Sequence, residues 1–177
     1  MKSIEAVKRL HYWSERGSFL FRTRDLGLIF EERGETLRST MKRLVSAGVI
    51  GKIHHDCYMY ELAHLKGVDV LRSIAVFLKP GEFTYESLES AASRWGFISQ
   101  IPVSQLQCVT TGSAGLAATR FGEIEYVHTD DSLNRCYTET IDNGILRLAT
   151  KERCLADLVS RGRSMDLIDW EELEEDD

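Results

Sequence analysis

A cluster of acidic residues and one histidine in the second half of the chain is the densest concentration of groups able to do chemistry. Its members are Glu123, Glu125, His128, Asp130 and Asp131. Carboxylate and imidazole groups of this kind hold the divalent metals of hydrolytic enzymes such as nucleases. Alternation along a strand, however, places Glu123 and Glu125 together on a solvent-facing side, and Asp130 and Asp131 follow in a turn. We therefore expect no metal site here, and a nuclease with its own DNA-binding part is kept as an alternative.

No other motif of the chain indicates a nucleophile, a nucleotide or a bound metal. Ser113 lacks the G-x-S-x-G context of a hydrolase nucleophile, and the glycine-containing residues 112–115 lack the lysine and the spacing of a phosphate-binding loop. His54, His55 and Cys57 have no second pair of ligands to complete a zinc site. The four cysteines are widely separated, so we expect free thiols. The sequence predicts a protein that is not an enzyme and has no cofactor.

The charge distribution favours a nucleic-acid partner for the N-terminal third of the chain. The chain carries 22 Lys and Arg against 28 Asp and Glu, a net charge of −6. Residues 1–55 hold eleven basic against six acidic residues, and the remainder holds eleven against twenty-two. A basic segment attached to an acidic body is typical of a DNA-binding module joined to a second functional part. Chance segregation of solvated charge is the alternative.

Three predicted helices and a hairpin would position these basic residues. The first helix spans residues 2–16, with Gly17 as its stop. Its apolar face is formed by Ile4, Val7, Leu10 and His11. A short second helix begins with Thr23 as N-cap and Asp25 in its first turn. Its apolar stripe is formed by Leu26, Ile29 and Phe30.

The third predicted helix spans residues 35–47 and ends at Gly48 in a left-handed conformation. Its apolar face is formed by Leu37, Met41, Leu44 and Val45. Two short strands follow around a turn at residues 54–57. This order of elements predicts a winged helix-turn-helix over residues 1–65.

The exposed face of the third helix carries donors suited to DNA. Arg38, Ser39 and Lys42 are placed to reach base edges or phosphates. Better placed for the phosphate backbone are Arg43, Arg22, Arg24 and Lys52. His54 and His55 are expected at the tip of the wing. The predicted DNA-binding residues are Arg22, Arg24, Thr36, Arg38, Ser39, Lys42, Arg43, Lys52 and His54. A solvated helix, or a winged helix that binds protein, is the alternative.

Residues 67–177 are predicted to form a small mixed α/β domain, which makes the whole chain an α+β fold. The apolar run 74–78 is either a strand or the end of a helix, and a helix begins at Thr84 or Tyr85. The apolar face of that helix is formed by Leu88, Ala91, Ala92 and Trp95. Strands are expected at residues 105–111 and 121–128, joined by a hairpin connection, and at 145–148.

A last helix is predicted between Lys151 and Arg161, capped by Thr150 and ended by Gly162. Its inward face is formed by Leu155, Leu158 and Val159. The final nine residues contain seven acids and no basic residue, which predicts a frayed acidic tail that Trp170 anchors at its start.

Three C-terminal segments carry a resemblance to a known family. They are LKPGEFTYESLESAASRWGFISQIPVSQLQCVTTG, FGEIEYVHT, and LRLATKERCLADLV with LIDWEEL. In this order, and with the helix ATKERCLADL after the strands, the chain resembles the AbiEi family of antitoxins. These proteins belong to bacterial type IV toxin–antitoxin systems that act in abortive infection and phage defence. The resemblance covers most of the chain.

The resemblance implies two functions. The N-terminal winged helix would repress its own operon by binding inverted repeats in operator DNA, with Arg38, Ser39, Lys42 and Arg43 in the DNA-binding role. The C-terminal domain, residues 67–177, would neutralise a cognate nucleotidyltransferase-like toxin, for which a stable complex is not assumed. Inverted repeats would also bring two copies together on DNA.

Two further expectations complete the sequence-based account. The N-terminal residues lack the apolar core of a signal peptide and no segment is apolar enough to cross a membrane, so we expect a cytoplasmic protein without a membrane partner. The alternative function is a transcription regulator with no antitoxin role, whose C-terminal domain senses a ligand or a protein partner.

Overall fold

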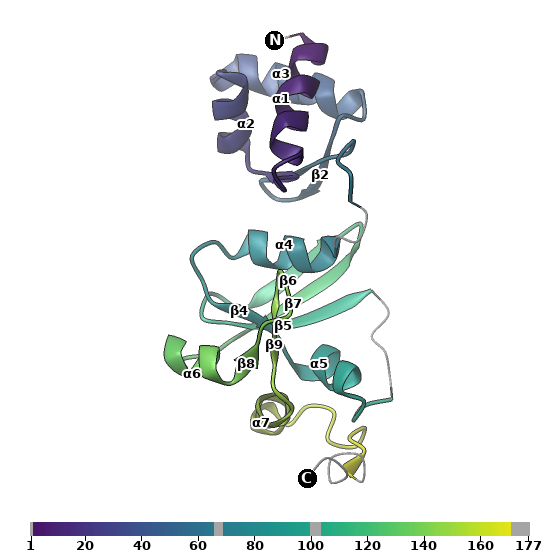
Figure 1. The fold of residues 1–177 in the computed structure, drawn as a ribbon, viewed down its shortest axis with the longest axis vertical. Helices are drawn as coiled ribbons and strands as arrows, with labels where there is room; N and C mark the ends of the chain where they lie inside the picture. The colour runs from purple at the N-terminus through teal and green to yellow at the C-terminus, as the bar shows by residue number, and fades with distance from the viewer. Residues whose placement is uncertain (1, 66–68, 100–103, 171–177) are drawn as a thin grey trace. The chain divides into compact units, whose positions relative to one another are not determined.

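The computed structural model describes residues 2–65, 69–99 and 104–170 as a mixed α+β fold. The chain divides into two compact units, Met1–Val68 and Asp69–Asp177 (Figure 1). The boundary predicted near Gly67 lies outside the described residues. Within the described part, no helix is long and apolar enough to cross a membrane.

Over residues 2–65, unit 1 contains three helices and a three-stranded antiparallel sheet. In chain order its elements are α1 (Ser3–Ser14), β1 (Leu20–Phe21), α2 (Thr23–Phe30), α3 (Gly34–Ser46), β2 (Ile50–His54) and β3 (Cys57–Tyr60). The strand order is β1-β3-β2, so β3 is central. The strand β1 was not expected from the sequence, because two residues are too few for an alternating pattern to be recognised.

The core of unit 1 lies where the three helices meet the sheet. Its fully buried side chains include Leu10, Leu26, Leu44 and Tyr60. The predicted inner face of α1 was partly wrong, since Ile4 and His11 are exposed and Ala6 is buried with Leu10. Val45 of α3, expected to face inward, is exposed, and Thr40 is buried in its place.

Unit 2 contains four helices and a six-stranded mixed sheet in its described residues. In chain order its elements are α4 (Val70–Leu78), β4 (Thr84–Glu86), α5 (Leu88–Trp95), β5 (Gln105–Thr110), β6 (Gly115–Thr119), β7 (Gly122–His128), α6 (Leu133–Thr138), β8 (Thr140–Ile141), β9 (Arg147–Ala149) and α7 (Lys151–Arg161). The strand order is β6-β7-β5-β4-β9-β8. Figure 1 shows α4 on one face of this sheet and α5 with α7 on the other.

The helix predicted to begin at Thr84 or Tyr85 begins instead at Leu88. Residues Thr84–Glu86 form β4, which pairs with β5 on one side and with β9 on the other. The side chains of Tyr85 and Glu86 in this inner strand are completely buried. These long-range partners override the helical pattern that extends N-terminally from Leu88. The apolar residues 74–78, left open between strand and helix, belong to α4.

The segment expected to connect two strands as a simple hairpin loop contains a strand of its own. Residues Gly115–Thr119 form β6, which pairs antiparallel with β7. The strands β5 and β7 are therefore parallel neighbours, with β6 at the sheet edge. The small side chains of β6 give almost no β-propensity signal, which explains why the sequence predicted a connection here.

The last helix, α7, has the predicted bounds. Thr150 Oγ1 accepts a hydrogen bond from the backbone N–H of Arg153 at 3.2 Å, and Gly162 is left-handed with φ 59°. Val159, expected to face inward, is exposed. Trp170 is also exposed, and the rest of the predicted acidic tail, residues 171–177, lies outside the described part.

Candidate nucleic-acid interface

The helix α3 separates its apolar and polar side chains onto opposite faces. Leu37, Met41 and Leu44 are buried against the rest of unit 1. The opposite face, which we call the α3 donor face, consists of Thr36, Arg38, Ser39, Lys42 and Arg43, all of them exposed. The side chain of Arg38 is 79% exposed and lies 3.5 Å from Glu35. An exposed ion pair of this length exchanges readily for another partner, because it contributes little stability.

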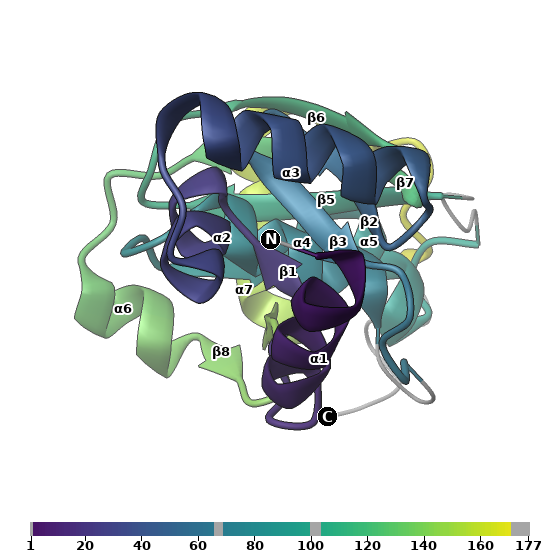
Figure 2. The same cartoon turned by 90° about the horizontal axis from the view of Figure 1, so that it is seen from above.

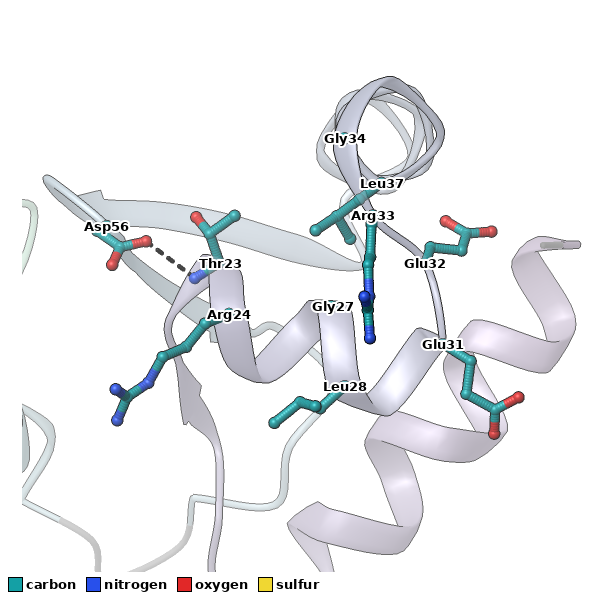
Figure 3. A pocket seen from close by; sticks show the side chains of 10 residues that line it. All are labelled: Thr23, Arg24, Gly27, Leu28, Glu31, Glu32, Arg33, Gly34, Leu37 and Asp56. Carbon is teal, nitrogen blue, oxygen red and sulfur yellow. Dashed lines mark hydrogen bonds between the residues drawn. The ribbon is translucent and has the colours of Figure 1, made fainter.

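A close approach between α2 and α3 fixes the position of the α3 donor face. A Cβ placed on Gly27 would lie 3.2 Å from both Leu37 Cδ2 and the backbone oxygen of Glu32. The three residues between the helices begin with Glu31 in a left-handed conformation, φ 56°. Glycine at the contact and a left-handed residue in the turn let α3 turn sharply away from α2 (Figure 3).

The start of α2 is held by backbone hydrogen bonds to two carboxylates. Asp25 Oδ2 accepts from the backbone N–H of Arg22 at 2.8 Å, and Asp56 Oδ1 accepts from that of Thr23 at 2.9 Å. Burial acts to raise the pKa of Asp56, but its hydrogen bonds with Thr23 and the charge of Arg22 outweigh burial and lower it. Arg22, the residue before α2, is half-buried and lies 3.9 Å from Asp56. Thr23 is therefore the first helical residue rather than the predicted N-cap.

A groove of about 660 Å³ lies between α2 and the first turn of α3. Arg24, predicted to contact phosphate, lies on its wall together with Gly34 and Leu37. Arg33, which the sequence interpretation did not select, lies directly before α3 and points into the space between the helices (Figure 3). Its position in the chain, next to the first helical residue, was the available signal. Glu31, Glu32 and Asp56 give the groove mixed charge.

The hairpin of β2 and β3 carries the remaining predicted residues. Lys52 is exposed and pairs across the strands with Tyr58, while His54 is half-buried and pairs with Cys57. The register shifts between Lys52 and His54, which indicates a bulge near the end of β2. The turn between the strands consists of His55 and Asp56. Of the two histidines expected at the tip, His55 lies there, whereas His54 is the last residue of β2.

Two carboxylates of the acidic cluster of unit 2, Glu125 and Asp131, are bound by arginines. Arg163 donates two hydrogen bonds to Glu125, at 2.7 and 3.0 Å, and Arg153 donates to Asp131 at 2.6 Å. His128 lies 3.0 Å from Asp130 through Nε2, and hydrogen bonding to that carboxylate raises its pKa. Within the described residues, no group of three or more His, Cys, Asp or Glu could hold a metal ion.

The four cysteine thiols are all free and buried. Burial raises the pKa of Cys57 to about 11, and it also raises the pKa values of Cys108 and Cys154. A thiol with a raised pKa is a poor nucleophile at neutral pH, because the thiolate is the reactive form.

Comparisons with protein-family models and with curated protein sequences found no match.

Proposed function

We propose that unit 1 is a winged helix-turn-helix that binds operator DNA and represses the operon of its own gene. The observation that carries this proposal is the α3 donor face, a row of exposed donors opposite a buried face that is apolar except for Thr40. A helix of thirteen residues is long enough to lie in a major groove, and arginine, lysine and serine donate to base edges and phosphates.

The arrangement around α2 supports the same proposal. A three-residue turn between two helices, with close packing at a glycine, is typical of a helix-turn-helix. The antiparallel hairpin of β2 and β3 follows α3 directly and takes the place of the wing. Arg24 and Arg33 on the groove wall would contact phosphates, which set affinity and register.

Removing two charges from the α3 donor face tests this proposal. We expect Arg38→Ala with Lys42→Ala to weaken binding to the DNA upstream of the gene by about 100-fold, since each contact contributes about 1–3 kcal/mol. Fluorescence anisotropy with a labelled duplex measures the affinity. Circular dichroism of the double variant checks that both units stay folded.

The matched control removes two charges elsewhere in unit 1. Lys2→Ala with Lys8→Ala changes the net charge equally and affects two exposed residues at the start of and within α1. This control should weaken binding less than tenfold. Equal losses in the two double variants would mean that bulk charge, rather than the α3 donor face, accounts for binding.

We further propose that the whole chain is an antitoxin of a type IV toxin–antitoxin system. The three C-terminal segments that resemble the AbiEi family support this proposal, and unit 2 would neutralise a nucleotidyltransferase-like toxin without requiring a stable complex. Co-expression with the neighbouring gene tests it. Rescue from a toxic neighbour is the expected result, whereas a harmless neighbour would favour a transcription regulator without an antitoxin role.

A further inference from the structure

The four sheet edges of the described strands differ in how they are protected. An edge strand exposes unpaired backbone N–H and C=O groups that can pair with another chain. Proteins block such edges with short strands, bulges, lysine, proline or a covering side chain. In unit 1 the edges are β1 and β2, and in unit 2 they are β6 and β8.

Three of these edges carry protective features. The strands β1 and β8 are two residues long, and β2 contains Lys52 and an irregular register. The edge at β8 is also covered by Arg147, whose Nη2 donates to the backbone oxygen of Thr140 at 2.6 Å. A backbone oxygen bonded in this way is no longer available to a further strand.

The fourth edge, β6, shows none of these features among the residues that the structure describes. Its five residues, Gly115–Thr119, include no charged residue and no proline, and their pairing with β7 is in regular register. Leu116 is 61% exposed, although it lies within a strand. Figure 2 shows β6 and β8 at opposite edges of the sheet in unit 2. In unit 2, the unprotected edge at β6 is therefore on the opposite side of the sheet from the protected edge at β8.

We propose that β6 pairs antiparallel with β6 of a second copy of this chain. A two-fold axis at Ala117 would join the two six-stranded sheets into one continuous sheet, which is the isologous arrangement of most protein dimers. This pairing lies in unit 2 and does not depend on the DNA-binding function proposed for unit 1.

The sequence of β6 is complementary to itself in this register. Ala117 faces its own equivalent, Leu116 faces Ala118 of the second copy, and Gly115 faces Thr119. No charge meets a like charge, and each Leu116 is placed beside a small side chain that leaves room for it. Two carboxylates of β7 lie opposite this edge, Glu125 across from Leu116 and Glu123 across from Ala118. Glu125 is bound by Arg163, which neutralises its charge.

The expected association is weak and reversible. Pairing of two five-residue strands buries less surface than the roughly 1,200 Å² of a stable interface. Analytical ultracentrifugation of the full chain should therefore show a mass that rises with concentration from 20.2 kDa towards twice that value. A single 20.2 kDa species up to millimolar concentration would overturn the proposal.

Lysine substitutions on the edge provide the specific test. Leu116→Lys with Ala118→Lys would place lysines opposite one another in both copies, and both positions are exposed, so unit 2 should stay folded. We expect this variant to be monomeric at every concentration. Leu133→Lys, an equally exposed position on α6, is the control and should associate like the unmodified chain. Self-association that persists in the double variant would place the interface elsewhere and contradict the proposal.

Cysteine cross-linking tests the register itself. Leu116→Cys with Ala118→Cys would place each new thiol opposite one in the second copy, so mild oxidation should give a covalent dimer. Leu133→Cys should give far less, because it is not on the edge. Equal cross-linking in both variants would contradict the paired register.

Discussion

At residue scale, Gly27 is the position where a side chain would most directly disturb the α3 donor face. Its missing Cβ leaves just enough room for Leu37 and for the backbone oxygen of Glu32. In an ordinary helix a glycine is unfavourable by about 1 kcal/mol compared with alanine, so packing against α3 is the physical reason for it here. The orientation of α3 depends on this contact.

We expect Gly27→Val to destabilise unit 1 by about 1–3 kcal/mol, because its methyl groups would force α2 and α3 apart. Urea unfolding followed by circular dichroism measures the change, and operator affinity should fall with it. The control is Lys8→Val, at an exposed position of α1. It should lower the free energy of unfolding by about 0.5 kcal/mol, which is the difference in helix propensity between lysine and valine. A Gly27→Val protein as stable as this control would show that the helices are not in close contact.

At the scale of elements, α7 is connected to the rest of unit 2 through Arg153. This side chain is 3% exposed and lies 2.6 Å from Asp131, 2.7 Å from Glu139 and 3.1 Å from Asp157. The hydrogen bond from Arg153 is the main cause of the lowered pKa of Asp131, and the same bond type lowers the pKa of Glu139. The ion pairs therefore hold α7 to α6 and to the loop after β7.

We expect Arg153→Met to destabilise unit 2 by about 1.5–3 kcal/mol at pH 7, because it removes charged hydrogen bonds from three carboxylates. The buried Asp157 keeps Arg161 as a charge partner, and Asp131 and Glu139 keep the more exposed Arg135. Carboxylates with a lowered folded pKa contribute stability above their unfolded pKa, about 4, and lose it as the pH falls through the folded value. The free energies of unfolding of the variant and of the unmodified protein should therefore become more similar as the pH falls from 5 to 3. Urea unfolding across this range measures it.

The control for this prediction is Arg135→Met. Arg135 bonds to the same two carboxylates, Asp131 and Glu139, but is 53% exposed. An exposed pair contributes about 1 kcal/mol or less. If both variants lost the same stability, burial of Arg153 would not be the cause.

The sequence predicted those elements whose signals are local. The bounds of α7 follow from Thr150 and Gly162, and the two faces of α3 follow from helical periodicity, with Val45 as the exception. The strands β4 and β6 were missed because their stability comes from partners distant in the chain. Arg33 has a local signal, its place directly before α3, but the groove that it lines forms only when α2 and α3 pack together.

At the scale of the whole molecule, charge is distributed unequally along the chain. Eleven basic and six acidic residues in the first 55 contrast with eleven and twenty-two in the remainder. If unit 1 binds DNA as proposed, the acidic remainder of the chain would keep its affinity for DNA in general low, and specific contacts would determine which site is occupied. The α+β class was predicted from the sequence, whereas the order of strands in the six-stranded sheet was not, because no local pattern encodes it.

The most direct test of the central claim is binding of the purified chain to the DNA upstream of its own gene, compared with a scrambled duplex, across a series of salt concentrations. We expect tight binding to the upstream duplex alone, with a salt dependence that corresponds to a few phosphate contacts. Equally weak binding to both duplexes would contradict an operator-reading role for the α3 donor face, and unit 1 would then be a protein-binding module.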